Sequence, residues 1–189
     1  MRKKKFRVRR SYDETAEMYD RRYISIQNKK YLDIIKHFKI PSNEPILDVG
    51  AGTGLFSKFL EKQNQVISCD ISFNMLKEGI KNNGLIFTIV CDSDALPIRR
   101  DSISIITCFS VIQNVPEPLN TINQFNLILK EGGKVILTAL AKLFSLEKLH
   151  ELTDNYCKVI DSWKLPIEDN AIVFHKPKKE KNSDNAIKD

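Results

Sequence analysis

The chain has 189 residues, of which 42% are hydrophobic and 29% charged, with a formal net charge of +6. This length allows one sizeable core and excludes two ordinary domains. A secretory signal is also excluded, because the segment from Ser11 to Glu14 is polar where an apolar run is needed, and no stretch is long and apolar enough to span a membrane.

The net positive charge of the chain comes from its two ends. Residues 1–10 contain seven Lys and Arg, and residues 176–189 contain five Lys. We expect both ends to be disordered tails around a single domain at residues 11–175. Such tails suit attraction to RNA phosphates or simply keep the protein in solution, and composition leaves both roles open.

The domain should begin with two helices within residues 11–40. Apolar side chains recur there at helical spacing, and Pro41 ends the pattern. The residues that define this pattern are Ala16, Tyr19, Ile24, Tyr31, Ile34, Ile35 and Phe38.

A glycine-rich turn follows the first predicted strand, which covers residues 46–49. Gly50, Gly52 and Gly54 alternate directly after it, and a helical pattern starts at Leu55. Glycines at this place allow a sharp turn at the carboxyl end of a strand, where α/β sheets bind ligands. NAD or FAD is disfavoured because Leu55 replaces the small residue of the dinucleotide fingerprint. For the glycines alone, a tight turn without a ligand stays open.

The rest of the chain alternates strands with helices. We expect strands at 66–70, 85–91 and 103–109, a helix opened by Pro116 and stopped by Gly132-Gly133, and a fifth strand through Leu137. A last helix at 143–156 and two short strands at 159–163 and 171–174 complete the pattern. This order predicts an α/β fold with a doubly wound sheet that ends in an antiparallel hairpin.

Acidic residues stand at the carboxyl ends of two of these strands. Asp70 ends the second strand, roughly 20 residues after the glycine strand, where a carboxylate accepts hydrogen bonds from ribose hydroxyls in dinucleotide folds. Ser72 then caps the next helix. Asp92 and Ser93 follow the third strand, and a plain turn is the alternative there.

With Asp48 two residues before Gly50, the run Leu47-Asp48-Val49-Gly50-Ala51-Gly52-Thr53-Gly54 resembles motif I of the class I S-adenosylmethionine-dependent methyltransferases. Asp92 before Leu96-Pro97 and the turn Leu129-Lys130-Glu131-Gly132-Gly133 are similar to two further family motifs. The resemblance implies a Rossmann-like, seven-stranded sheet at residues 45–175, with the helices at 11–40 forming a lid.

The resemblance also implies residue roles. The glycines and Asp48 would hold the methionine part of S-adenosylmethionine, Asp70 the ribose, and Asp92 with Ser93 the adenine. Tyr19 is a candidate aromatic neighbour of the sulfonium, although helical aromatics usually only pack. Further expected cofactor contacts are Ile71, Met75 and Phe109, and the expected acceptor-facing residues are Ser110, Gln113, Asn114 and Tyr12.

Several features bear on the acceptor and on partners. Catalysis of this kind can rest on positioning, so no catalytic residue is assigned. The segment 109–115 resembles the group that includes quinone C-methyltransferases, whereas the basic ends and residues 23–27, which faintly resemble rRNA methyltransferases, favour RNA. A small-molecule acceptor and a module that binds the cofactor without catalysis are the alternatives.

The third strand, residues 85–91, carries no charge, Pro or Gly and should lie at the sheet edge, where several RNA methyltransferases bind a small zinc-ribbon activator. We expect a similar partner, although a covered apolar strand is the simpler explanation. Cys69, Cys91, Cys108 and Cys157 show no metal-site spacing and indicate reduced thiols in a cytoplasmic protein.

Overall fold

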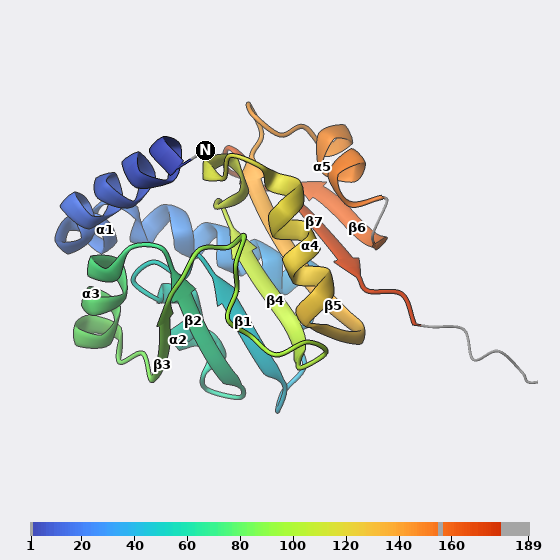
Figure 1. The fold of residues 1–189 in the computed structure, drawn as a ribbon, viewed down its shortest axis with the longest axis horizontal. Helices are drawn as coiled ribbons and strands as arrows, with labels where there is room; N and C mark the ends of the chain where they lie inside the picture. The colour runs from blue at the N-terminus through green and yellow to red at the C-terminus, as the bar shows by residue number, and fades with distance from the viewer. Residues whose placement is uncertain (1, 155–156, 179–189) are drawn as a thin grey trace, which may run out of the picture.

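The computed structural model describes residues 2–154 and 157–178. Seven strands form one mixed sheet in the order β3-β2-β1-β4-β5-β7-β6 (Figure 1). Strands β1 to β5 run parallel to one another, and β7 is antiparallel to both of its neighbours, β5 and β6. This confirms the Rossmann-like sheet with an antiparallel end. The strands are β1 Pro45–Val49, β2 Gln65–Asp70, β3 Phe87–Val90, β4 Ile103–Phe109, β5 Leu129–Leu140, β6 Lys158–Lys164 and β7 Asp169–His175.

Short helices connect these strands. Ser72 caps α3 by accepting a hydrogen bond from the Met75 amide at 3.1 Å, and Gly84 ends the helix with a left-handed φ of 70°. The short helices are α2 Leu55–Leu60, α3 Phe73–Asn83, the 3-10 helix η1 Ile112–Asn114, α4 Pro118–Ile128 and α5 Leu146–Thr153.

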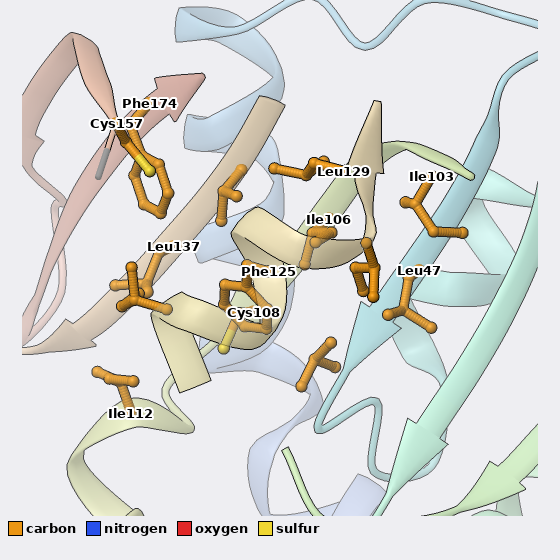
Figure 2. Packing of buried hydrophobic residues seen from close by; sticks show 14 of the residues in the cluster. Leu47, Ile103, Ile106, Cys108, Ile112, Phe125, Leu129, Leu137, Cys157 and Phe174 are labelled. Carbon is orange, nitrogen blue, oxygen red and sulfur yellow. The ribbon is translucent and has the colours of Figure 1, made fainter. Parts of the chain in front are cut away.

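Apolar side chains fill both faces of the sheet. On one face, Phe125 of α4 packs among Leu47, Ile106 and Leu137 of the central strands, and all four are fully buried (Figure 2). On the other face, Ile34 belongs to a second cluster together with residues of α2 and β1. Burial on both faces explains why the central strands read as continuous apolar runs.

The N-terminal segment differs from the expectation. Helix α1 spans Arg2–His37 without a break, so residues 2–10 are not a disordered tail and the two expected lid helices are one. Lys and Arg are good helix formers, so the basic composition does not oppose a helix. Figure 1 shows α1 running from the N-terminus to a place beside α3 and then changing direction to cross the sheet.

Polar contacts hold this helix on the rest of the molecule. Lys4 Nζ donates to the Val115 carbonyl at 3.0 Å, and Ser72 Oγ donates to Asp13 Oδ1 at 2.6 Å. The composition of residues 1–10 does not indicate such contacts with distant segments. The expectation of disorder was wrong for this reason.

The Gly132-Gly133 pair also differs from the expectation. Helix α4 ends at Ile128, and the two glycines lie inside β5, where the register against β4 shifts. Gly132 has a φ of 71°, so it allows an irregularity in the strand rather than stopping a helix.

Two expectations fall partly outside the described residues, namely the end of the last helix at Tyr156 and most of the basic segment 176–189. Among the helices that the structure describes, none combines the length and the apolar character needed to cross a membrane.

Candidate functional site

A cavity of about 730 Å³ lies at the carboxyl ends of the central strands, under α1. Its floor includes Val49 of β1, Asp70 of β2 and Phe109 of β4, and its cover includes Tyr12 and Tyr19 of α1. The volume lies within the range of about 300–1,000 Å³ that is typical of small-molecule sites.

The glycine loop presents bare backbone to this cavity. Gly50 and Gly52 line it with φ values of 71° and 58°, and a Cβ on Gly50 would stand 2.1 Å from Val111. The amides of Gly50 and Ala51 donate to the Cys69 carbonyl at 2.8 and 3.0 Å, which fixes the loop on β2. The loop can therefore hold a ligand against its backbone.

Gly54 has a different place from the other two glycines. It does not line the cavity, and a Cβ there would stand 2.3 Å from a methyl group of Leu85. Its φ is 75°. Gly54 therefore allows the close packing of α2 and the Leu85 side chain.

Asp70 joins the glycine loop to the start of α3. Its Oδ2 accepts from the Gly52 amide at 2.9 Å, and its Oδ1 accepts from the Ser72 amide at 2.8 Å. Burial raises the pKa of Asp70 to about 6, although these two hydrogen bonds oppose the rise. Each carboxylate oxygen keeps a further lone pair for a ligand that fills the cavity.

Asp48 lies behind the loop rather than in the cavity wall. It is 4% exposed and accepts from Ser57 Oγ at 2.5 Å and from Thr107 Oγ1 at 2.7 Å. Burial raises its pKa, and the two hydroxyl hydrogen bonds oppose that shift. Asp48 borders a separate hollow of about 30 Å³ next to Gly50 and Gly52, which has the volume of about one water molecule.

The loop after β3 carries an acidic pair that contacts α1. Lys5 Nζ lies 2.7 Å from Asp92 Oδ2 and 2.6 Å from Asp94 Oδ2. Burial lowers the pKa of Lys5, but its hydrogen bonds to the two carboxylates outweigh this, so the pKa is raised. The Ser93 hydroxyl is 3.1 Å from that of Thr121. Asp92 and Ser93 both line the cavity beside Lys5.

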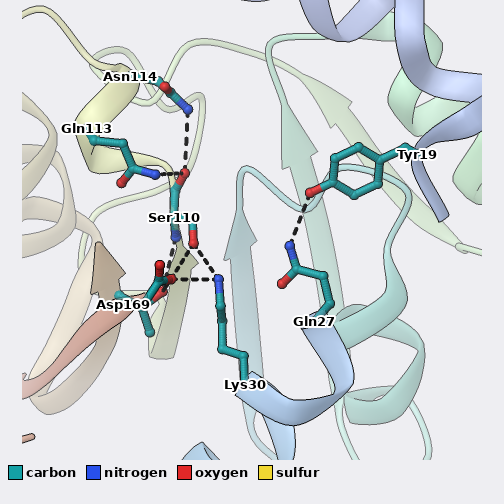
Figure 3. Close-up of polar contacts among 8 residues, drawn as sticks. Tyr19, Gln27, Lys30, Ser110, Gln113, Asn114 and Asp169 are labelled. Atoms are coloured by element: carbon teal, nitrogen blue, oxygen red, sulfur yellow. Dashed lines mark hydrogen bonds and ion pairs between the residues drawn. The ribbon is translucent and has the colours of Figure 1, made fainter. Parts of the chain in front are cut away.

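The segment after β4 forms the other end of the cavity. Gln113 Nε2 donates to the Ser110 carbonyl at 2.7 Å, and Asn114 Nδ2 donates to Tyr12 Oη at 3.3 Å (Figure 3 shows Gln113, Ser110 and Asn114). Ser110 has a left-handed φ of 56°, which is uncommon for a residue with a side chain. The first contact holds the segment together, and the second connects it to helix α1 above the cavity.

Three tyrosines of α1 pack against one another along the cover in tilted pairs. The ring centroids of Tyr12 and Tyr19 are 6.3 Å apart, and those of Tyr19 and Tyr23 are 4.9 Å apart. Gln27 Nε2 donates to Tyr19 Oη at 3.2 Å (Figure 3). Burial raises the pKa of both Tyr12 and Tyr19, so both stay neutral near pH 7.

The structure thus brings together nearly all residues that the sequence placed at a site. Asp48 and Gly54 are the two that lie outside the cavity wall. The expected residues that line it are Gly50, Gly52, Asp70, Ile71, Met75, Asp92, Ser93, Phe109, Tyr19, Tyr12, Ser110, Gln113 and Asn114.

Sequence reasoning missed two buried charged residues in the wall, Lys30 and Asp169. Both are 3% exposed, and Lys30 Nζ lies 2.7 Å from Asp169 Oδ2. A signal for Lys30 was present, because it stands four residues before the buried Ile34 and so on the apolar side of α1. Asp169 lies at the start of the last strand and gave no such signal.

Comparison with known proteins agrees with this geometry. Residues 47–137, about half of the chain, match the family described as "Methyltransferase domain". This part of the chain has the sequence pattern of a methyltransferase domain. The matched residues include the glycine loop, Asp70 and Asp92, and the resemblance to the class I S-adenosylmethionine-dependent methyltransferases is confirmed.

Curated relatives of the methyltransferase domain act on small molecules or carrier-bound groups, as their names state. The chain is 34% identical over 117 residues to a malonyl-[acyl-carrier protein] O-methyltransferase of Hamiltonella defensa, with 60% of this chain and 43% of the relative covered. It is 32% identical over 128 residues to a ubiquinone/menaquinone biosynthesis C-methyltransferase of Wigglesworthia glossinidia brevipalpis, with coverages of 61% and 51%. The chain spans about half the length of these relatives.

The fold is shared with a methyltransferase solved together with another protein. That structure is described as a complex between the Haloferax volcanii Trm112 methyltransferase activator and the putative methyltransferase. The TM-score is 0.77 at 16% identity, with 90% of this chain and 97% of the other covered. At this identity the comparison shows the common fold.

Proposed function

We propose that this protein binds S-adenosylmethionine in the cavity under α1 and transfers its methyl group to an acceptor. The observation that carries the proposal is the contact between Asp70 and the Gly52 amide in the cavity wall. It places a carboxylate beside bare backbone at two neighbouring strand ends, which suits ribose hydroxyls and an adjoining extended chain.

The residues of the cavity fit this cofactor from end to end. Gly50 and Gly52 would hold its methionine part and Asp70 its ribose, while Asp92 and Ser93 would hold the adenine. Ile71 and Met75 would add apolar contacts. Asp48 would act by holding the loop through Ser57 and Thr107, or through a water molecule in the small hollow beside it.

The bound cofactor supplies a methyl group that is already activated on a sulfonium, so the protein's share is to position the acceptor and exclude water. Helix α1 suits that role because it covers the cavity and is tied to the core along its length. Ser72 donates to Asp13 at 2.6 Å, and Asn83 donates to Asp20 at 3.1 Å. These contacts hold the helix over the cavity.

A small-molecule acceptor fits this covered cavity better than RNA, and the named relatives point the same way. RNA, the acceptor favoured by the sequence, remains the second candidate for one reason. The first turns of α1 expose Arg2, Lys3, Arg7, Arg9 and Arg10 beside the cavity cover.

Two measurements test the proposal. In calorimetry, the full chain should bind S-adenosylhomocysteine at one site and should not bind NAD. With tritium-labelled S-adenosylmethionine and separate small-molecule, RNA and protein extracts, the label should enter the small-molecule extract. Label in RNA would favour the second candidate, and tight binding without any transfer would indicate a non-catalytic binding module.

We also propose a protein partner at the edge of the sheet. β3 is the edge strand, and Ile86, Phe87 and Val90 are 70%, 57% and 52% exposed. An uncovered apolar edge invites a further strand from another protein. A small zinc-ribbon activator is the partner we propose, since the Haloferax volcanii protein of the same fold is described in complex with an activator.

Co-expression tests this partner. A Trm112-type activator should raise the soluble yield of the full chain and its affinity for S-adenosylhomocysteine, and Phe87→Lys should abolish both effects. Leu32→Lys, on the exposed side of α1, serves as the control and should keep them. Equal yield and affinity with and without the activator would contradict the proposal.

A further inference from the structure

A buried polar cluster stands at the end of the cavity away from Asp92. Lys30 of α1 contacts Asp169 of β7 and the hydroxyl of Ser110, which follows β4 (Figure 3). All three residues line the cavity. The cluster therefore joins the cover, the last strand and the segment expected to face the acceptor.

One carboxylate oxygen of Asp169 receives the three donors of this cluster. Its Oδ2 lies 2.7 Å from Lys30 Nζ, and it accepts from Ser110 Oγ at 2.6 Å and from Thr138 Oγ1 at 3.2 Å. With three donors on it, this oxygen has little capacity left to accept a hydrogen bond from a ligand. The contacts of Asp169 Oδ2 are therefore made with groups of the protein itself.

The ammonium group of Lys30 has more N–H donors than hydrogen-bond partners. It has three N–H groups, and its two contacts among the described residues are Ser110 Oγ and Asp169 Oδ2. Lys30 is 3% exposed, and burial lowers its pKa, although Asp169 counteracts the shift. A buried ammonium in a cavity wall gains strongly from a further oxygen, above all from a charged one.

Gln113 adds a second polar group to the same end of the cavity. Its Nε2 donates to the Ser110 carbonyl at 2.7 Å, which fixes the orientation of the amide. Its Oε1 is buried and has no hydrogen-bond partner among the described residues. Gln113 Oε1 therefore has unused capacity to accept a hydrogen bond at this end of the cavity.

We infer that Lys30 binds an anionic oxygen of the acceptor, a carboxylate or a phenolate-type oxygen, and so selects acidic acceptors. This inference rests on the proposed function, because it assigns the acceptor end of the same cavity. An acceptor that binds as an anion has no proton to lose at the attacking oxygen, so no side chain has to act as a base. Gln113 would receive a hydroxyl or amide N–H elsewhere on the acceptor.

Three probes of matched shape test the inference on the full chain saturated with S-adenosylhomocysteine. They are 1-naphthoate, neutral 1-naphthamide and cationic 1-naphthylmethylamine, with binding followed by calorimetry near neutral pH. We expect the naphthoate to bind at least about tenfold more tightly than the other two, since a charged hydrogen bond contributes at least that factor. Lys30→Gln should remove this preference.

Lys29→Gln is the matched control, because Lys29 is the preceding, exposed lysine of the same helix. It should keep the preference for the naphthoate. Because Lys30→Gln leaves Asp169 with one donor fewer, the double variant Lys30→Gln/Asp169→Asn provides a neutral pair and should show the same loss. Retained affinity for S-adenosylhomocysteine shows that both variants are folded.

The outcomes separate the inference from the proposed function. Equal affinity for the three probes, including no measurable binding of any, would overturn the inference, as would a preference for the amine or a preference that survives Lys30→Gln. Failure of the wild-type chain to bind S-adenosylhomocysteine would instead overturn the proposed function. The probe preference, measured on the chain alone, would still report on Lys30.

Discussion

The carboxylate of Asp70 accepts a hydrogen bond from the Gly52 amide at 2.9 Å, and this contact joins the end of β2 to the glycine loop after β1. The same carboxylate accepts from the Ser72 amide at the start of α3. Asp70 therefore shapes the loop on one side and offers its remaining lone pairs to the cavity on the other.

Asp70→Asn should weaken the binding of S-adenosylhomocysteine by about 10- to 100-fold. The substitution removes the charge from the hydrogen bonds to the ribose, each of which contributes about 1.5–3 kcal/mol. Calorimetry measures the change, and Asp154→Asn at an exposed position is the control. Equal affinities of the variant and the wild-type chain would remove Asp70 from the site.

The affinity for S-adenosylhomocysteine should rise as the pH increases through about 6. The pKa of Asp70 in the folded chain is about 6, raised by burial from 3.8, and only the ionised carboxylate accepts from both ribose hydroxyls. In calorimetry between about pH 5 and pH 8, Asp70→Asn should lack this rise. An identical pH profile in the variant would contradict the assignment.

The raised pKa of Asp70 also predicts how the stability of the ligand-free chain depends on pH. Stability should fall with rising pH, whereas the affinity for S-adenosylhomocysteine should rise. Because the folded state holds the Asp70 proton more tightly than the unfolded state, the free energy of unfolding should fall as the pH rises from about 4 to about 6. Urea unfolding of the wild-type chain and of Asp70→Asn measures this difference. The raised pKa of Asp48 contributes to both curves, so the difference isolates Asp70.

Gly54→Ala should destabilise the chain more than Gly84→Ala. Both glycines have left-handed φ values, 75° and 70°, so each substitution costs about 1–2 kcal/mol in backbone strain. Only at Gly54 does the new Cβ meet Leu85, at 2.3 Å, which adds about 1–3 kcal/mol, whereas the space at Gly84 is open. Urea unfolding measures both losses.

The Leu85→Ala background provides the check on this explanation. Removing the Leu85 methyl groups should reduce the additional loss caused by Gly54→Ala and leave the effect of Gly84→Ala unchanged. Equal losses for the two glycine substitutions in the wild-type background would show that glycine is required at position 54 only for the left-handed φ, and not for the close approach of Leu85.

Lys5→Gln should loosen the first turns of α1. Lys5 is the contact of this segment with the acidic pair Asp92 and Asp94, at 2.7 and 2.6 Å. Amide hydrogen exchange of residues 2–10 should become faster, while Lys3→Gln, at an exposed position, should leave it unchanged. Unchanged exchange in Lys5→Gln would show that other contacts hold the segment.

The sheet and most of the cavity followed from the sequence because local patterns encode them. The apolar run of residues 103–109 coincides with β4, and the glycine loop ends a strand as expected. Asp70 and Asp92 were identified because the carboxyl ends of parallel strands meet at one edge of the sheet. The register of these strands then brings their side chains into one cavity.

The parts that escaped prediction depend on contacts between distant segments. The basic start of the chain is helical and docked, since Lys5 finds acidic partners 87 and 89 positions away. The pairing of Lys30 with Asp169 likewise joins α1 to the last strand. Gly132 looked like a helix stop, but its left-handed φ serves an irregularity inside β5. A local pattern cannot distinguish these cases.

The most direct test of the account is a crystal structure of the full chain with S-adenosylhomocysteine. We predict that the ligand lies against Gly50 and Gly52, with its ribose oxygens within hydrogen-bond distance of Asp70 and its adenine beside Asp92. A ligand elsewhere on the molecule, or a cavity closed by side chains with Asp70 turned away from it, would contradict the account.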